Sequence, residues 1–294
     1  MKTLRLIVFL SVITITFGSK CQIFYKIEGN GLEKPSFLFG THHLAPISVI
    51  EDYNVVQYLN EVEQVVGEID LTQDQMKLAM AMQPYMMAPS DSTLSKILSP
   101  EDYELVSKEF KKWAPMPGME LSMLEGMKPN VVTTMVTVKM IADQLPEFDP
   151  QKQADTYLQQ IAIEQGKKVK GLETPEFQAN LLYNYQPIPV QAEELVEMLK
   201  SPEEAMDAAR KLNEVYLNYD LDGMYSLSQE DKDHPEFMIA LLDRRNSDWL
   251  NKIPEIINHD ASLIVVGALH LAGEKGLVKG LREQGYLVTP LDSK

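Results

Sequence analysis

Short hydrophobic runs, each about the length of one strand, gather toward the two ends of the chain. Near the beginning, the β-rich runs "QIFYKIEG" and "PSFLFG" flank the turn-forming segment "NGLEKP", so this region is predicted to form a hairpin. A helical stretch follows around Ile50 to Val62. The segment "EQVVGEIDL" (63–71) then has a short apolar core with acidic residues at its far end, which predicts a buried strand.

The last part of the chain has the pattern of a compact α/β unit. The run "ASLIVVGALH" predicts a strand, residues 274–284 a helix closed by Gly285, and "YLVTPL" a final strand. A further short strand, "KKVKGL", follows the glycine at position 166.

The middle of the chain has a helical pattern instead. Residues 72–160 are rich in Met, Leu and Ala and are interrupted by prolines, and residues 176–250 return to helical spacing. One helix is predicted to begin with Ser99 as its N-cap and Pro100 at its first position. We therefore expect an α/β fold: one domain over 21–294, with a mixed sheet from the N- and C-terminal segments and a helical insertion at about 72–160. The methionines at the start of the insertion are interpreted as flexible core, with an adaptable binding groove as the lesser hypothesis: Met76, Met80, Met82, Met86 and Met87.

The first twenty residues form a pattern of their own. Lys2 and Arg5 precede an apolar run that ends at Phe17, and the small residues Gly18 and Ser19 follow. This order is typical of a secretory signal peptide, and the run is short for a permanent membrane span. Residues 1–20 are thus predicted to direct export, to the periplasm or outside the cell. Lipid anchoring at Cys21, the only cysteine, is the weaker alternative, and a single cysteine excludes an intrachain disulfide.

Charge narrows the classes of partner. The formal net charge is −16 and becomes −19 if the leader, with its three basic residues, is removed. Such a surface repels polyphosphate, so we expect a peptide or small-molecule substrate and no nucleic acid.

The chain contains an internal repeat with histidines. The segments "SFLFGTHHLAP" (36–46) and "SLIVVGALHLAG" (262–273) each run from a serine through an apolar strand into Gly-x-x-His-Leu-Ala. A glycine at a strand end permits a tight turn, with positive φ as one option, and a side chain three residues later can project over the carboxyl end of the strand. The repeat predicts that His43 and His270 meet at one rim of the sheet. His42 is then a bystander, either a donor behind the site or a solvent-facing residue.

Five segments in order resemble the TraB/PrgY/GumN family, which includes the Tiki metalloproteases. They are "FLFGTHH", "VVGEIDL", "GKKVKGLETPEFQ", "DRRNSDW" and "VVGALHLAGEKGLVKGLREQGY". The resemblance implies an α/β fold related to the erythromycin-esterase and ChaN-like proteins, with the two Gly-x-x-His histidines and a strand-end glutamate as metal-binding or catalytic residues. Its Tiki branch implies Mn²⁺- or Co²⁺-dependent peptide hydrolysis, and its TraB/PrgY branch implies interference with peptide pheromones.

On this resemblance, His43, Glu68 and His270 form a metal-ligand set of two imidazoles and one carboxylate, with positions left for water and a substrate carbonyl; Zn²⁺ is a further candidate ion. Asp70 lies two residues beyond Glu68 and shares its face if the strand stays extended, so it is expected to be a fourth ligand or an orienting residue.

Two further residues are catalytic candidates. Glu173 follows a short strand and is expected to act as a general base or ligand, the alternative being a cap of the helix that begins after it. Arg245 and Arg244 are adjacent on a predicted helix, so only one of them faces inward. We expect Arg245 to keep a carboxylate ionised or to stabilise an oxyanion, and Arg244 to form a surface ion pair.

Three functions remain open from these residues. The first is an exported, divalent-metal-dependent hydrolase acting on peptides. In the second, histidine and glutamate activate water without a metal ion, as in erythromycin-esterase-like chemistry. The third is a binding protein that holds a peptide or pheromone in the helical insertion without cleaving it.

Overall fold

The structure is a computed structural model that describes residues 22–145, 148–149, 152–230 and 235–294. The predicted leader (1–20) and Cys21 lie outside the described residues. Within the described residues, no helix combines the length and apolar character that crossing a bilayer requires.

The core is a mixed sheet of six strands in the order β4-β3-β5-β2-β1-β6. The strands are β1 (Phe24–Glu28), β2 (Ser36–Thr41), β3 (Gln64–Gly67), β4 (Lys168–Gly171), β5 (Ser262–Gly267) and β6 (Leu287–Pro290). The four strands β4, β3, β5 and β2 are parallel, whereas β1 pairs antiparallel with both β2 and β6. The predicted α/β fold with a mixed sheet from both ends of the chain is confirmed, and so is the N-terminal hairpin.

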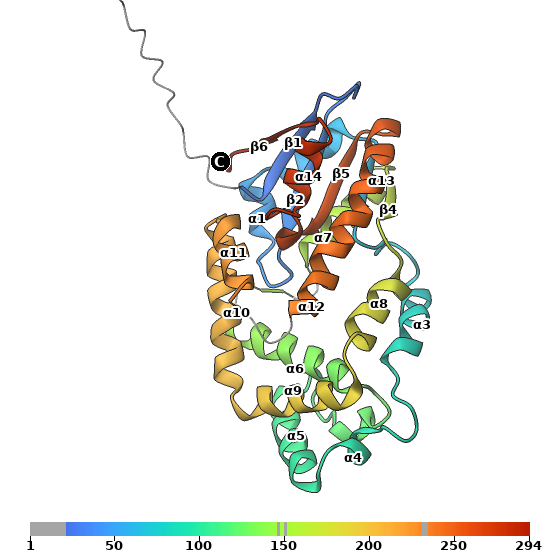
Figure 1. Ribbon diagram of the computed structural model, residues 1–294, viewed down its shortest axis with the longest axis vertical. Helices are drawn as coiled ribbons and strands as arrows, with labels where there is room; N and C mark the ends of the chain where they lie inside the picture. Colours follow the sequence, from blue (N-terminus) through green and yellow to red (C-terminus); the bar gives the residue numbers. More distant parts are fainter. Residues whose placement is uncertain (1–21, 146–147, 150–151, 231–234) are drawn as a thin grey trace, which may run out of the picture.

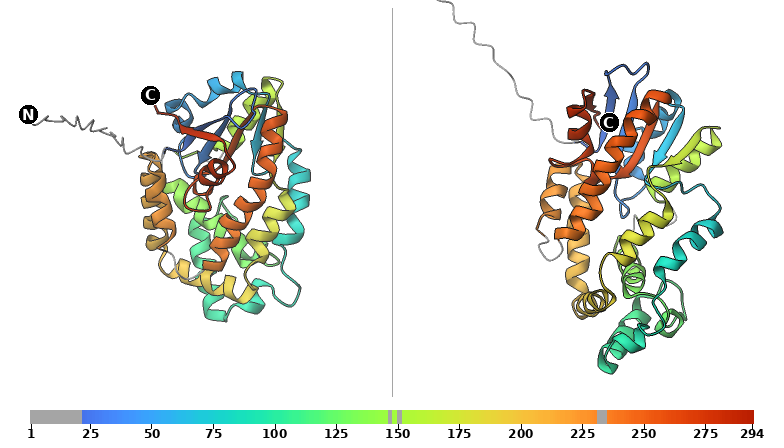
Figure 2. Two further views of the ribbon diagram at one scale, coloured as in Figure 1. Left: turned by 45° about the horizontal axis from the view of Figure 1, so that its top comes forward. Right: turned by 45° about the vertical axis from the view of Figure 1, so that its right-hand side comes forward.

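Helices cover both faces of this sheet (Figures 1 and 2). The helices α13 (Arg245–His259) and α14 (Leu277–Glu283) lie over one face, and α1 (Ser48–Asp52), α2 (Val55–Tyr58) and α7 (Ala154–Glu164) lie over the other. Because side chains alternate along a strand, Phe37 and Phe39 point to the same side, where Phe37 packs on Tyr58 with tilted rings and Phe39 packs on Tyr53 edge to face. These residues belong to one continuous buried core.

A second unit, made of helices, extends from one end of the sheet along the long axis of the molecule (Figure 1). It contains α3 (Gln75–Met86), α4 (Leu94–Ile97), α5 (Pro100–Trp113), α6 (Pro129–Gln144), α8 (Pro175–Asn184), α9 (Ile188–Lys200) and α10 (Pro202–Leu217). The next helix, α11 (Leu221–Ser228), packs against the core of the sheet through Leu221 and Met224. Helices α4, α5, α6, α9 and α10 enclose a hydrophobic core of their own. As predicted, α5 begins at Pro100, with Ser99 Oγ accepting a hydrogen bond from the amide of Asp102.

The helical unit differs from the predicted insertion in its boundaries. It draws α8–α10 from the chain after β4, whereas α7, which begins inside the predicted 72–160, packs against β3 and β4. The reason is that each amphipathic helix buries its apolar stripe against whichever neighbour the tertiary fold offers.

Several elements are also shorter than predicted. The strand predicted over 63–71 ends at Gly67. The helix predicted around 50–62 is interrupted at Asn54, whose φ is +49°, so it is divided into α1, α2 and a 3₁₀ turn at Leu59–Glu61. The helix predicted over 274–284 is α14, Leu277–Glu283.

Candidate functional site

A pocket of about 330 Å³ opens at the carboxyl ends of the parallel strands. The residues that follow β2, β3 and β5 supply His43, Glu68 and His270 to its lining. Carboxyl ends of adjacent parallel strands lie at the same edge of a sheet, which is where α/β proteins place their sites. The rest of the wall is mostly apolar and comes from α8, α11 and the turn before α13: Leu182, Met224, Leu241 and Leu242.

The two Gly-x-x-His turns lie side by side in this pocket. Strands β2 and β5 are neighbours, with Gly40 opposite Val266 and Thr41 opposite Gly267. Neither glycine of the motif has a positive φ, which corrects the option of a left-handed turn. The first glycine, Gly40, is needed for steric reasons, because a Cβ at this position would lie 2.9 Å from the Cα of Ala268.

His270 is buried and its tautomer follows from its neighbours. The Asn246 amide donates to the carbonyls of His270 (3.1 Å) and Lys275 (2.9 Å), so its oxygen faces the ring. His270 Nδ1 therefore carries the hydrogen and donates to Asn246 Oδ1 at 2.7 Å, leaving Nε2 to accept from Arg245 Nη1 at 2.9 Å. The ring packs on Trp249, with centroids 4.4 Å apart. Burial lowers the pKa of His270 to about 3, so the ring is neutral at neutral pH.

Arg245 lies at the centre of the site with all five of its N–H donors engaged. Nε and Nη2 form a two-point contact with Glu173, at 3.0 and 2.6 Å, and Nη2 also donates to Glu68. Nη1 donates to the Leu241 carbonyl (3.1 Å) and to His270. Of the two roles expected for Arg245, holding the carboxylates fits this geometry, because no donor is left for a substrate oxyanion.

The backbone before Arg245 turns it inward. A π-helical turn, Ile239–Arg244, precedes α13, and such turns often mark functional sites. The adjacent Arg244 points to solvent and pairs with Glu236 at 3.6 Å, as the helix geometry predicts.

Glu68 is ionised and fully oriented. Its Oε1 accepts from the Gly267 amide at 2.9 Å, and its Oε2 accepts from Arg245 and from Gln178 Nε2 at 3.0 Å. Burial opposes the charge of Glu68, but a protonated His270, Arg245 and the Gly267 amide outweigh it and lower the pKa to about 2. At neutral pH the guanidinium carries this effect, because His270 is neutral.

Glu173 belongs to the same cluster and is not the helix cap. The cap of α8 is Thr174, whose side chain accepts from the amide of Phe177. Glu173 Oε1 accepts from Gln178 at 3.2 Å in addition to Arg245. Burial raises the pKa of Glu173 despite the pairing with Arg245.

His43 differs from His270 in exposure and charge. Its side chain is 64% exposed, and Nδ1 lies 3.6 Å from Oδ2 of Asp155. The interaction with Asp155 raises the pKa of His43 to about 9. Asp155 is buried on α7, and Thr41 Oγ1 donates to its Oδ1 at 3.0 Å. Asp155 is not among the residues predicted from the sequence, because an acidic residue in the first turn of a helix is common and carries no specific signal.

His42 and Asp70 have different surroundings. His42 is half-buried and lines the pocket beside Tyr216, with ring centroids 5.3 Å apart, and its Nε2 is buried without a hydrogen-bond partner among the described residues. Burial, then the charge of His43, lower the pKa of His42 to about 4. Asp70 does not line the pocket: β3 ends before it, and its Oδ1 accepts from the amide and hydroxyl of Thr72 instead.

The sequence as a whole also matches a known protein family. The sequence model of that family aligns with residues 23–290, nearly the whole chain. The chain belongs to the TraB/PrgY/gumN family. No curated protein and no solved structure gives a significant match. In this TraB/PrgY/gumN protein, residues from all five segments of the family resemblance meet around Arg245 and its pocket.

The divalent ion implied by the family does not fit the side chains of this TraB/PrgY/gumN protein as they lie. His270 Nε2 and Glu68 Oε2 both accept from Arg245, and the Asp70 carboxylate is turned to Thr72. Within the residues that the structure describes, no three His, Cys, Asp or Glu side chains are grouped to hold a metal ion. The cation that Glu68 and His270 share is instead the guanidinium of Arg245.

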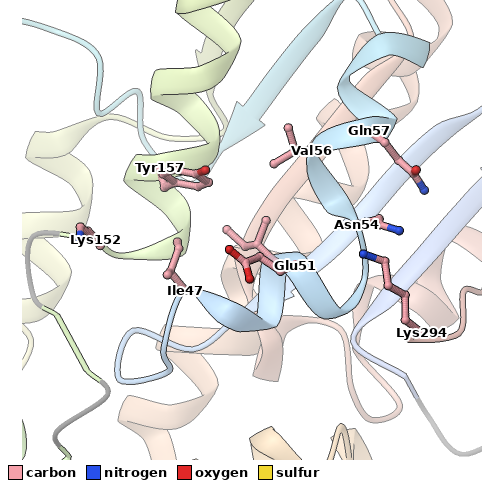
Figure 3. A pocket seen from close by; sticks show the side chains of 9 residues that line it. Ile47, Glu51, Asn54, Val56, Gln57, Lys152, Tyr157 and Lys294 are labelled. Carbon is pink, nitrogen blue, oxygen red and sulfur yellow. The ribbon is translucent and has the colours of Figure 1, made fainter.

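A larger cavity, of about 510 Å³, lies between α1, α2 and the start of α7 (Figure 3). Tyr157 and Glu51 line it, while Lys152 and Lys294 lie on opposite sides of it. None of the predicted site residues lines this cavity, so we assign the candidate site to the smaller pocket.

Proposed function

We propose that this protein is an exported hydrolase that acts on peptides, with His43 as the group that moves the proton. The observation that carries the proposal is the pairing of His43 with the buried Asp155 at a pocket whose inner wall holds an ionised carboxylate, Glu68. A histidine oriented by a carboxylate and open to a pocket is a common arrangement for general base catalysis.

The reaction uses a water molecule between these two residues. Among the described residues, Glu68 Oε1 accepts a hydrogen bond from the Gly267 amide alone, which leaves a lone pair to hold the water. His43 Nε2, in its neutral form, takes a proton from that water as its oxygen attacks the substrate carbonyl. The same proton then passes to the leaving nitrogen as the peptide bond breaks. Asp155, whose Oδ2 lies 3.6 Å from Nδ1, stabilises the charged ring that forms.

The buried cluster fixes this geometry. Arg245 holds Glu68 and Glu173 together, and Gln178 bridges the same two carboxylates. A side chain held by several charge-assisted hydrogen bonds loses little energy to reorganisation during the reaction.

The pocket wall supports a preference for apolar groups. Leu182, Met224, Leu241, Leu242 and Leu269 all line it. A substrate with an apolar side chain next to the scissile bond would bury that side chain here, at about 25 cal/mol per Å² of apolar surface.

A metal-dependent hydrolase is the second candidate. What favours it is the tautomer of His270, since a hydrogen on Nδ1 leaves Nε2 with the lone pair that metal ligands use. Mn²⁺, Co²⁺ or Zn²⁺ on Glu68 and His270 requires that Arg245 first release both of them.

Peptide hydrolysis before and after chelation separates these candidates. We expect the purified protein to cleave members of a peptide library at a rate that EDTA does not change, and His43→Ala to remove this activity. Activity that EDTA abolishes and Mn²⁺ or Co²⁺ restores would establish the metal-dependent candidate instead. Peptides that bind and are never cleaved would leave only the binding function.

Export is part of the proposal and rests on the pattern of residues 1–20. We expect the mature protein, recovered from the periplasm or the medium of a bacterial host, to begin near residues 19–22. A protein retained inside the cell with Met1 intact would contradict export, and a lipid-modified Cys21 would show anchoring instead.

A further inference from the structure

A buried lysine lies in the helical unit, away from the candidate active site. Lys128 immediately precedes α6 and is only 6% exposed. It lines a cavity of about 470 Å³ that lies between the end of α3, the end of α8 and the start of α9. The other lining residues are mostly apolar, among them Met87, Pro89 and Ile188.

The ammonium group of Lys128 has only neutral partners. Nζ donates to the Tyr85 carbonyl at 2.6 Å and to Asn184 Oδ1. Asn184 Nδ2 donates in turn to Asn180 Oδ1 at 2.9 Å, which keeps the amide oxygen turned toward the lysine. Both hydrogen bonds of Nζ thus go to neutral oxygens, and Lys128 forms no ion pair with the described residues. Two of the three donors of the ammonium are satisfied, and its charge has no counterion in the described part of the chain.

This arrangement is unusual for a lysine. Buried lysines are almost always paired, because burial removes the hydration of the ammonium and, without a counterion, nothing compensates for that loss. The two oxygens belong to the C-terminal turns of α3 and α8, whose dipoles favour a cation. On the side of the cavity, however, α6 begins after Lys128 and α9 begins after Pro187, and their dipoles favour an anion, while the Asn130 amide in the first turn of α6 donates to Gln191 Oε1 at 3.3 Å.

We propose that this cavity binds the carboxylate of a small acid with an apolar body, such as the carboxyl terminus of a peptide. The carboxylate accepts the third hydrogen bond of Lys128 and supplies the missing countercharge, while the apolar body packs on Met87 and Ile188. The site is separate from the catalytic pocket, although both touch α8: Leu182 faces the pocket and Asn184 faces the cavity.

The test is a binding measurement with matched probes and does not depend on hydrolysis. N-acetyl-leucine and N-acetyl-leucine amide have the same body and differ in the carboxylate. By calorimetry on the full protein, we expect the acid to bind and the amide to bind at least about tenfold more weakly, the effect of one charge-assisted hydrogen bond. Lys128→Met should weaken the binding of the acid by a similar factor, whereas Lys77→Met, on the surface of α3, should leave the affinity unchanged.

A second pair of variants leaves Lys128 in place, in case Lys128→Met does not fold. Met87 is 40% exposed at the cavity, so Met87→Glu adds a carboxylate there that repels the acid, and Met87→Gln does not. The acid should lose affinity in Met87→Glu only. Equal affinity for acid and amide, equal binding by Lys128→Met and the wild type, or binding of inorganic phosphate in preference to the acid would each overturn the proposal.

Discussion

The two copies of Gly-x-x-His show that one motif can give two chemically different histidines. His43 is 64% exposed and His270 only 4% exposed. The pKa of His43 is raised to about 9 by its interaction with Asp155, whereas burial lowers the pKa of His270 to about 3. At neutral pH one ring is charged and the other is neutral, although the same backbone pattern places both.

The difference comes from the residue behind each ring. The Nδ1 atom of His43 faces a carboxylate, Asp155, and that of His270 faces an amide, Asn246. A carboxylate stabilises the charged ring, and an amide fixes the tautomer without adding charge. The motif therefore places the histidines, and their partners from distant helices assign their chemistry.

The largest expected effect is the loss of activity in His43→Gln. We expect hydrolysis to fall by about 100- to 10,000-fold, the usual contribution of a general base, while the free energy of unfolding falls only by the attraction between His43 and Asp155, which solvent screens because the ring is exposed. His270→Ala should instead also lower the free energy of unfolding, by about 2–4 kcal/mol, because a buried ring and two hydrogen bonds are removed. Steady-state kinetics and urea denaturation of both variants make the comparison. Equal stability losses in the two would contradict it.

Arg245 and its neighbour Arg244 provide the next test. Arg245→Met leaves Glu68 and Glu173 buried without a cation, so we expect a loss of about 3–5 kcal/mol in the free energy of unfolding. Arg244→Met removes an exposed pair and should cost at most about 1 kcal/mol. Urea denaturation at neutral pH measures both. Similar values for the two arginines would mean that the central cluster does not hold the site together.

Much of the fold could be predicted from local sequence. The hairpin of β1 and β2 and the cap at Ser99 follow from turn residues and capping chemistry, which act over a few positions. The break at Asn54 could not be predicted, because a left-handed residue within a helical pattern depends on how the flanking turns pack. The same holds for α7, whose pattern is helical whichever surface it covers.

For the candidate site, the repeat and the strand ends indicated which side chains gather, but not how they pair. Asp155 reaches His43 from a helix more than a hundred residues away, and nothing in its local sequence indicates this partner. Four of the five hydrogen bonds of Arg245 likewise reach three distant segments of the chain, at Glu68, Glu173 and His270. Asp70 was misplaced because its predicted orientation required β3 to continue past Gly67.

Exchanging the partners should reverse the contrast between the two histidines. In Asp155→Asn the pKa of His43 should fall from about 9 toward the ordinary value of about 6.5, and in Asn246→Asp the pKa of His270 should rise above about 3. If neutral His43 is the base, activity rises with pH through about 9 in the wild type, and Asp155→Asn moves this limb down. NMR titration of the ring protons and pH–rate profiles measure the shifts. A rate limb that stays in place would remove His43 as the base.

The same pKa values set the pH dependence of stability. A raised pKa in the folded state means that His43 stabilises the protein fully below about 6.5 and loses this contribution as pH rises toward about 9. A lowered pKa means that His270 destabilises the protein as pH falls below about 6.5, because the unfolded chain takes up the proton first. Asp155→Asn should remove the loss of stability at alkaline pH, which comes from His43, and should leave the loss of stability at acid pH, which comes from His270.

The smallest expected effect compares the two glycines of the repeat. A Cβ on Gly40 would lie 2.9 Å from the Cα of Ala268, whereas one on Gly267 would lie 3.4 Å from Glu68 Oε1, at a φ of −55° that alanine adopts freely. We expect Gly40→Ala to cost about 1–3 kcal/mol in the free energy of unfolding, because β2 must move away from the turn after β5. Gly267→Ala should be neutral or stabilising by up to about 1 kcal/mol, since alanine has less freedom in the unfolded chain. If denaturant titrations give equal costs, close approach is not why the first copy of the motif has its glycine.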